Sequence, residues 1–107
     1  MVDYHPTRAQ LVVEDVLTAL GNPVRLGIVR DLAQSDAART CGSFPVAVTK
    51  ATATFHWRVL RESGITREHK EGRTKTVELR RADLDARFPG LLDAILAASP
   101  PVTDTDA

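Results

Sequence analysis

Apolar positions recur at helical spacing in the first third of the chain. Over residues 8–20 and 23–33, aliphatic side chains return every three or four positions, as on the buried face of an amphipathic helix. Gly21 and Asn22 separate the two segments, and Pro23 suits the first turn of the second. The pattern therefore predicts two consecutive helices.

The segment from Thr49 to Gly64 predicts another helix, with two unlike faces. Thr49 is a favourable N-cap, and Gly64 is typical of the position just after a helix end. Ala53, Trp57 and Leu60 share one side, which predicts packing into the core. The opposite side carries Ala51, Thr54, Phe55, Arg58 and Glu62. An aromatic ring beside an arginine is unusual on an exposed helix face and needs a functional explanation.

The second half of the chain adds a hairpin and more helix. Residues 65–79 read as a strand, a turn at Glu71–Gly72 and a second strand. Helical spacing resumes over residues 82–98, where Pro89 must break or restart the helix. Residues 33–48 are polar, then small and interrupted by Pro45, so we expect a loop with at most one short helix there.

The order helix, helix, (short helix), helix, hairpin, helix is typical of a winged helix-turn-helix protein. In this layout the helix before the hairpin enters the DNA major groove, and the hairpin is the wing. We therefore expect a mostly α fold with a β-hairpin wing. Residues 1–98 form the DNA-binding domain, and residues 99–107 are expected to be a disordered acidic tail.

Length and composition narrow the class of protein. A chain of 107 residues fits one domain that is small for burying a large core alone, a shortage that a dimer would relieve. A single cysteine excludes an intrachain disulfide framework and a Cys-rich zinc site. No apolar run approaches the roughly 20 residues that span a bilayer, and the amino terminus lacks a secretory signal. We expect a cytoplasmic protein without membrane association.

The formal net charge of zero conceals a strong asymmetry. Residues 41–81 carry nine Lys and Arg against four Glu, a net charge of +5, whereas residues 1–40 and 82–107 carry −1 and −4. A basic segment of this kind is the electrostatic footprint of a protein that binds a polyanion. The alternative is a solvated basic face without a partner.

The predicted groove-binding helix and wing supply the candidate DNA contacts. Hydroxyl groups, a ring against a thymine methyl and a guanidinium are groups that read base edges, and lysines hold phosphates. At the hairpin tip, Arg73 and Lys75 should contact the backbone or the adjacent minor groove. His56 lies between the two helix faces, so either packing or a phosphate contact fits it. The candidate DNA-binding residues are Lys50, Thr52, Thr54, Phe55, His56, Arg58, Arg61, Lys70, Arg73 and Lys75.

Three segments resemble the ArsR-type family of winged-helix bacterial transcriptional repressors. "ALGNPVRLGIVRDLA" (residues 19–33) resembles its Pro-x-Arg-Leu helix, and "TKATATFHWRVLRESGI" (residues 49–65) its recognition helix with a His-x-x-x-Leu-Arg-x-x-Gly ending. "KEGRTKTVEL" (residues 70–79) resembles its wing with a Gly-Arg tip. The resemblance covers Leu11 to Leu96. It implies a homodimer built on the first and last helices, a palindromic operator, repression of transcription, and an inducer that is often a metal ion.

The chain departs from the family at its metal sites. The family's thiolate sites need at least two neighbouring cysteines, and this chain has only Cys41. Its carboxylate–imidazole site on the last helix needs histidines, and residues 82–98 contain none. We therefore expect no metal or other cofactor and an unknown small-molecule inducer. Cys41 is a candidate redox-sensing residue, although a buried or tolerated thiol is the favoured interpretation.

Two other classes of function compete with DNA binding. An enzyme is not expected, because no nucleophile–base pair, glycine-rich phosphate loop or pair of carboxylates stands out. A winged helix used mainly for protein–protein contact stays open as the alternative. The positive segment 41–81 favours DNA over that alternative.

Overall fold

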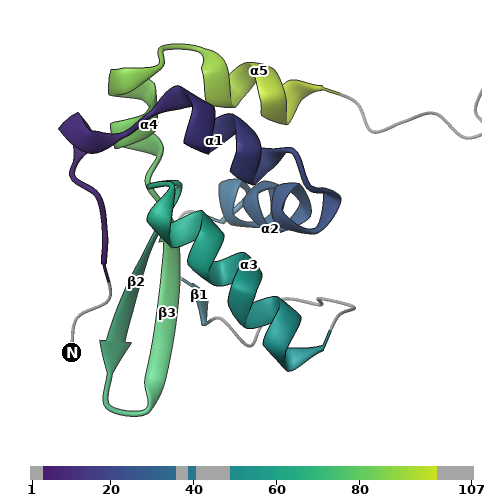
Figure 1. The fold of residues 1–107 in the computed structure, drawn as a ribbon, viewed down its shortest axis with the longest axis vertical. Coiled ribbons are helices and arrows are strands. Elements are labelled where there is room, and N and C mark those ends of the chain that lie inside the picture. Colours follow the sequence, from purple (N-terminus) through teal and green to yellow (C-terminus); the bar gives the residue numbers. More distant parts are fainter. Residues whose placement is uncertain (1–3, 36–38, 41–48, 99–107) are drawn as a thin grey trace, which may run out of the picture.

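The computed structural model describes residues 4–35, 39–40 and 49–98 of the chain. Their arrangement is a winged helix-turn-helix (Figure 1), which confirms the predicted fold class. In chain order the elements are η1 (Arg8–Gln10), α1 (Val13–Leu20), α2 (Pro23–Ala33), β1 (Arg39–Thr40), α3 (Lys50–Glu62), β2 (Thr66–Glu71), β3 (Thr74–Leu79), α4 (Arg81–Arg87) and α5 (Leu91–Ala97).

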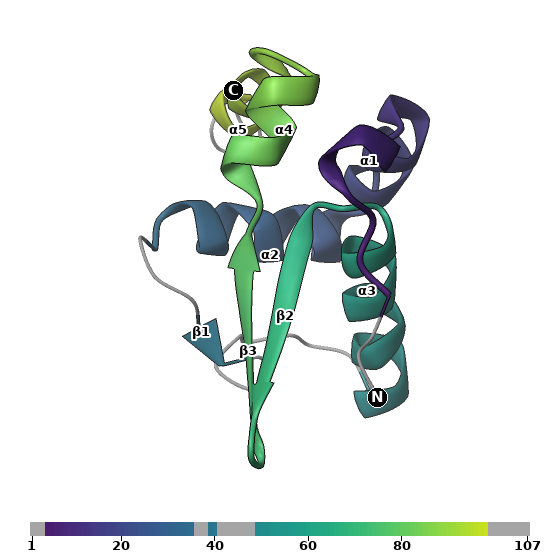
Figure 2. The ribbon, with the colours of Figure 1, turned by 90° about the vertical axis from the view of Figure 1, so that its left-hand side faces the viewer.

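Helices α1, α2, α4 and α5 pack above the hairpin, and α3 lies beside it. In Figure 2, α2 lies across the middle of the molecule, α1 and the α4–α5 pair lie above it, and α3 and the hairpin extend below. The interior is almost entirely aliphatic, and each helix contributes to it. Among the described residues, none of the helices is long and apolar enough to span a membrane. The fully or nearly buried apolar side chains are Leu11, Val16, Ala19, Leu20, Ile28, Val29, Leu32, Leu60, Ile65, Val77, Leu84 and Leu92.

The single helix predicted over residues 8–20 is wrong, because the chain breaks at Leu11 and Val12. Both residues have extended backbone conformations between η1 and α1. Leu11 is only 1% exposed, and its carbonyl accepts a hydrogen bond of 2.8 Å from Arg87 Nη2. The burial of Leu11 and its hydrogen bond with Arg87 thus outweigh the local pattern, which favoured a continuous helix through Leu11 and Val12.

Helices α2 and α3 start where the sequence predicts, at Pro23 and after the predicted N-cap Thr49, and α2 has in addition an N-cap, Asn22, that was not predicted. The Asn22 side-chain oxygen accepts from the backbone N–H groups of Val24 (2.9 Å) and Arg25 (3.1 Å), with Pro23 in the first turn. Thr49 Oγ1 accepts from the backbone N–H of Thr52 at 3.2 Å. These bonds satisfy donors that a helix start leaves unpaired, so both boundaries lie where the sequence places them.

The end of α3 is a tight corner built on Gly64. The Gly64 N–H donates to the Arg61 carbonyl and the Ile65 N–H to the Leu60 carbonyl, the pairing of a Schellman motif. Gly64 has a φ of 85°, in the left-handed region that favours glycine. A Cβ at this position would overlap the Leu11 side chain. The corner therefore fixes how the chain leaves α3 and enters β2.

The wing is an antiparallel hairpin with one added strand. Strands are ordered β1–β3–β2, and Glu71 faces Thr74 across the turn, where Gly72 has a φ of 62°. The short strand β1 pairs with β3 and was not predicted, because two residues carry no readable pattern. The loop and short helix expected around Pro45, together with Cys41, lie at residues 36–38 and 41–48, outside the described residues, as does the tail 99–107.

The remaining expectations for the core and the last helix hold. Leu60 is fully buried, and Trp57 is half-buried and packs against the core. The helical segment over residues 82–98 divides into α4 and α5 at Phe88–Gly90, so Pro89 ends the first helix as predicted. Gly90, with a φ of 81°, is the N-cap of α5.

The packing at Gly64 predicts a large cost for a single methyl group. Gly64→Ala should lower the free energy of unfolding by about 2–4 kcal/mol, because it forces a left-handed alanine into the space of Leu11. Gly27→Ala is the control: nothing lies within 4 Å of its added Cβ, and it should stabilise α2 by about 0.5–1 kcal/mol. Urea unfolding followed by circular dichroism measures both, and equal stability of the two variants would contradict this packing.

Candidate nucleic-acid interface

One face of α3 is free of the core and carries most of the predicted base-reading groups. Phe55 is 47% exposed, and its ring lies 5.8 Å from the Arg58 guanidinium carbon, a cation–π distance. On the other side of the helix, Leu60 is buried and Trp57 half-buried. The predicted phasing of α3 is therefore confirmed. The exposed predicted residues of this face are Lys50, Thr52, Thr54, Phe55 and Arg58.

The threonine hydroxyls on this face are already oriented by the helix. Thr54 Oγ1 donates to the Lys50 carbonyl at 3.0 Å, and Thr52 Oγ1 accepts from Thr49 Oγ1 at 2.9 Å. The proton of Thr54 is thus committed to the backbone, and its oxygen retains lone pairs that can accept from a base amino group. Thr52 has its own proton left for donation. The two hydroxyls can therefore read opposite hydrogen-bonding groups.

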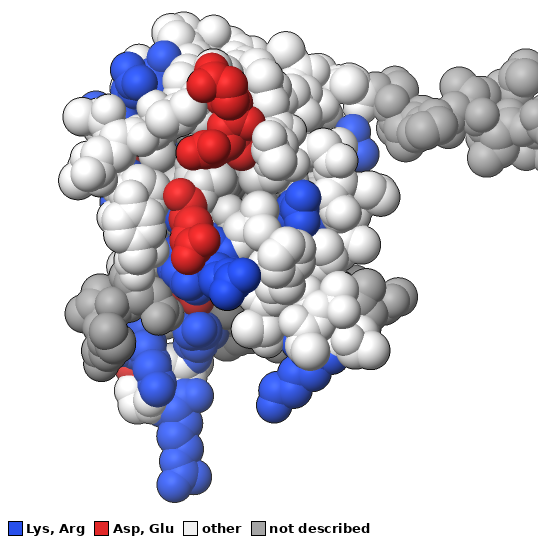
Figure 3. Space-filling view, in the orientation of Figure 1, with Lys and Arg blue, Asp and Glu red and all other residues white. Residues whose placement is uncertain are grey.

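The wing presents cations beside this face. Lys70 and Lys75 are exposed and stand directly opposite each other on β2 and β3, and Arg73 is exposed in the turn. Two like charges directly opposite in an antiparallel pair are destabilising, and a polyanion would relieve the repulsion. Figure 3 shows Lys and Arg along the lower edge, over the wing and the N-terminal end of α3, while most acidic side chains lie above, over α1 and the C-terminal end of α3.

His56 belongs to the core, so its assignment as a DNA contact is corrected. Its side chain is 6% exposed, and Nδ1 lies 3.1 Å from Arg25 Nη1. Of the two interpretations that fitted His56, packing is the one that the structure supports. Its place near the boundary of the two helix faces left the choice open from the sequence.

Arg61 is also withdrawn from the candidate surface. Its side chain is 13% exposed, and Nη1 lies 3.4 Å from Glu68 Oε2 on β2. Lys75 Nζ lies 3.0 Å from the other oxygen of the same carboxylate, but Lys75 keeps 45% of its side chain exposed. Arg61 thus braces the wing against α3, and Lys75 both braces the wing and faces solvent.

Arg25 is the structural residue that sequence reasoning missed. It is 9% exposed, and its guanidinium donates to the carbonyls of Ala19 (2.7 Å) and Thr18 (3.4 Å) at the end of α1. Its third contact is the His56 ring. Burial lowers the pKa of His56, and the nearby Arg25 charge lowers it further. The ring is therefore neutral and accepts from Arg25 at Nδ1. The Pro-x-Arg-Leu pattern alone does not reveal this contact between Arg25 and His56.

A second network, built on Asp83 and the buried Arg80, holds the base of the wing. Burial alone would raise the pKa of Asp83, but hydrogen bonds from Arg8 (2.7 Å) and Arg80 (2.9 Å) hold it below its ordinary value. Arg80 Nη1 also donates to the Pro6 carbonyl at 2.7 Å, and Arg67 lies 3.7 Å from Asp83. Part of the basic segment 41–81 is thus used to fasten α4 and the N-terminal segment, and does not face the candidate interface.

The described part of the chain contains no group of three His, Cys, Asp or Glu side chains placed to hold a metal ion. Cys41 lies outside it. The site therefore consists of an exposed helix face, a basic wing and the buried contacts that orient them. This is the arrangement of a winged helix-turn-helix DNA-binding protein.

Comparisons with known sequences define the family. A family model described as a helix-turn-helix domain matches residues 20–69. The chain is 35% identical over 82 residues to an uncharacterized HTH-type transcriptional regulator, YceK of Bacillus subtilis (strain 168). The match covers 75% of this chain and 82% of that relative.

Solved structures agree with that assignment. An ArsR family transcriptional regulator superposes with a TM-score of 0.64 at 23% identity, over 77% of this chain and 90% of its own. The transcriptional repressor BigR from Xylella fastidiosa gives a TM-score of 0.59 at 27% identity, over 81% and 88%. A possible transcriptional regulator for arsenical resistance gives 0.58 at 26%, over 78% and 86%. The chain belongs to the HTH-type transcriptional regulators, and its fold is that of an ArsR family regulator.

The lowered pKa of His56 predicts a pH-dependent stability. Its contribution is fully present above the ordinary histidine value of 6.5 and is lost as pH falls below it, because the unfolded chain takes up a proton that the folded chain resists. His56→Asn keeps an acceptor oxygen but cannot titrate. Between pH 7.5 and 5.5 its stability should fall less than that of the wild type.

His69→Asn is the matched control, because His69 is exposed and pairs with Glu78 on the wing. Urea midpoints at both pH values give the comparison. The interpretation of His56 fails if the His56→Asn variant loses as much stability on acidification as the wild type does.

Proposed function

We propose that the protein is a homodimeric repressor that binds a palindromic operator. Each subunit places the exposed face of α3 in a major groove and its wing on the neighbouring backbone. The observation that carries the proposal is that two surfaces share one edge of the molecule. The exposed face of α3 carries Thr54, Phe55 and Arg58. Basic side chains of the wing and of the N-terminal end of α3 lie along the same lower edge in Figure 3, while most acidic side chains lie above them.

The two surfaces divide the work of recognition. Side chains of α3 carry the groups that distinguish base edges: hydroxyls, an aromatic ring and a guanidinium. Lys70, Arg73 and Lys75 carry charge at the wing, where contact with phosphates gives affinity and register without reading sequence. The cation–π contact between Arg58 and Phe55 restrains both side chains before DNA binds.

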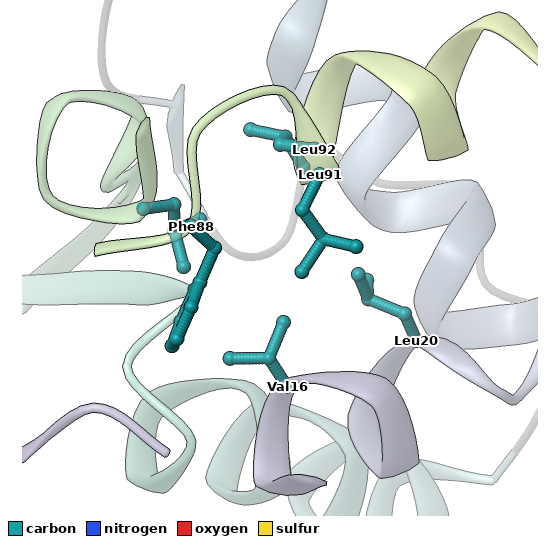
Figure 4. A pocket seen from close by; sticks show the side chains of 6 residues that line it. Val16, Leu20, Phe88, Leu91 and Leu92 are labelled. Atoms are coloured by element: carbon teal, nitrogen blue, oxygen red, sulfur yellow. The ribbon is translucent and has the colours of Figure 1, made fainter. Parts of the chain in front are cut away.

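The dimer interface proposed here lies at α1 and α5. Val12 and Leu17 are 42% and 49% exposed, which is unusual for aliphatic side chains beside a core. Between α1, α4 and α5 lies an apolar hollow of about 10 Å³ (Figure 4). A two-fold axis would bring the same patch of both subunits together and bury it. The hollow is lined by Val16, Leu20, Leu84, Phe88, Leu91 and Leu92.

Regulation is proposed to proceed without the family's metal sites, through a small molecule. The support is the donor set: one cysteine in the chain and no histidine on α4 or α5. The apolar hollow has room for about one water molecule, so it does not hold an inducer in this conformation.

The DNA-binding proposal is tested with a duplex selected by the purified protein from a random-sequence pool. Arg58→Ala should cost about 1–3 kcal/mol on the selected duplex and less on a random duplex, if Arg58 pairs with a base. Arg73→Ala should weaken both duplexes similarly and lower the salt slope by about one unit for each lost phosphate contact. Fluorescence anisotropy at several salt concentrations measures both variants. Failure of the wild type to bind any duplex would overturn the proposal and favour a protein-binding role.

The dimer proposal predicts that a charge on the exposed face of α1 separates the subunits. Leu17→Asp should shift the protein from dimer to monomer at micromolar concentration and weaken binding to the selected duplex, because one half-site leaves half of the phosphate contacts unmade. Thr18→Asp makes the same charge change at the next exposed position and should disturb the dimer less. Sedimentation velocity gives the answer, and a folded wild-type monomer at that concentration contradicts the proposal.

A further inference from the structure

Glu68 is a buried carboxylate at the junction of α3 and the wing. Its side chain is 2% exposed, although it lies on a strand of the basic hairpin. Oε2 lies 3.4 Å from Arg61 Nη1 of α3, and Oε1 lies 3.0 Å from Lys75 Nζ of β3. One side chain on β2 therefore joins the recognition helix to the opposite strand of the wing.

The backbone of the same residue holds the N-terminal segment. The Glu68 N–H donates to His5 Nε2 at 3.1 Å. The neighbouring Pro6 is buried, and its carbonyl is held by Arg80 at the end of the wing. Four parts of the chain thus meet at Glu68: α3, β2, β3 and the segment before η1.

The charge of Glu68 opposes the proposed function of the surface around it. A carboxylate between the reading helix and the wing repels phosphates, so removing its charge should by itself strengthen binding to any DNA. In return for this lost affinity, the carboxylate holds two cationic side chains in a defined position. The carboxylate lies 3.4 Å from Arg61 Nη1 and places an opposite charge 3.0 Å from Lys75 Nζ, whose partner directly across the hairpin is the like charge of Lys70.

The helix and the wing need such a brace. α3 ends and β2 begins at the corner at Ser63–Ile65. Their opposite ends, the N-terminal end of α3 and the wing tip, lie at the same edge of the molecule (Figures 1 and 2). DNA fixes the spacing between a major groove and the backbone beside it, so the two ends must be held at a matching distance. The contact of Glu68 with Arg61 and Lys75 lies between the two elements and restrains that spacing.

We infer that Glu68 is a positioning residue for DNA recognition, which sets the wing relative to α3 and thereby gives discrimination between operator and other DNA at the cost of total affinity. This inference rests on the proposed DNA-binding function. The quantity that tests it is the ratio of affinities for the selected and the random duplex. The proposals on dimerisation and on the inducer are tested by other measurements.

The test compares two neutralised carboxylates of the same strand. Glu68→Gln should lower the ratio of affinities for the selected and random duplexes by about tenfold, the size of a typical coupling between contacting residues. Glu71→Gln removes the same charge at an exposed position nearer the turn. It should tighten both duplexes and leave the ratio unchanged. The inference is overturned if Glu68→Gln behaves as Glu71→Gln does.

A second variant separates positioning from charge and from folding. Glu68→Asp keeps the charge but is one methylene shorter, so it cannot reach both Arg61 and Lys75. We expect this variant to stay folded, with a thermal unfolding midpoint above the assay temperature. It should still show a lowered ratio of affinities for the selected and the random duplex. Where Glu68→Gln does not fold, this variant decides: a wild-type ratio overturns the inference, and a lowered ratio supports it. If the wild type binds no DNA, the proposed function fails first.

Discussion

The contact of Arg25 with α1 and His56 is the constraint on which the rest of the domain depends. A guanidinium that is 9% exposed needs partners for its donors, and the structure supplies two carbonyls and a neutral imidazole in place of a carboxylate. The carbonyls of Thr18 and Ala19 lie in the last turn of α1, where the helix dipole is negative. The charge is thus compensated by a helix end, and α1, α2 and α3 are tied together at one point.

That point connects the two surfaces on which the proposed function depends. α1 carries the exposed aliphatic side chains assigned to the dimer, and α3 carries the exposed face assigned to DNA. Because His56 contacts Arg25 from the inner side of α3, the outer side is left to Phe55 and Arg58. The orientation of the exposed face of α3 therefore follows from the buried contact between His56 and Arg25.

Local chemistry predicted the parts of the fold that depend on neighbouring residues. The start of α2 at Pro23, the cap at Thr49, the corner at Gly64, the turn at Gly72 and the break at Pro89 need only short-range sterics and hydrogen bonding. The phasing of α3 followed from a clear apolar side with a polar face opposite. These features could be read from the sequence because the residues that cause them lie within a few positions of one another.

The features that sequence missed depend on distant contacts. The break before α1 depends on Leu11 against Gly64 and on a hydrogen bond from Arg87. Arg61 faces Glu68, and Arg80 faces Asp83, so counting basic residues between 41 and 81 overstated the charge available to DNA. Nothing in a one-dimensional pattern shows which arginines of a basic segment are used up inside the domain.

The division of α3 into buried and exposed positions has a consequence for how such regulators diverge. His56 and Leu60 are tied to the interior and cannot change without repacking several elements. Thr52, Thr54, Phe55 and Arg58 are exposed, so they can be exchanged singly at little cost to folding. Gene duplicates of this protein could therefore acquire new target sequences through a few surface codons, while the interior that orients the helix stays as it is.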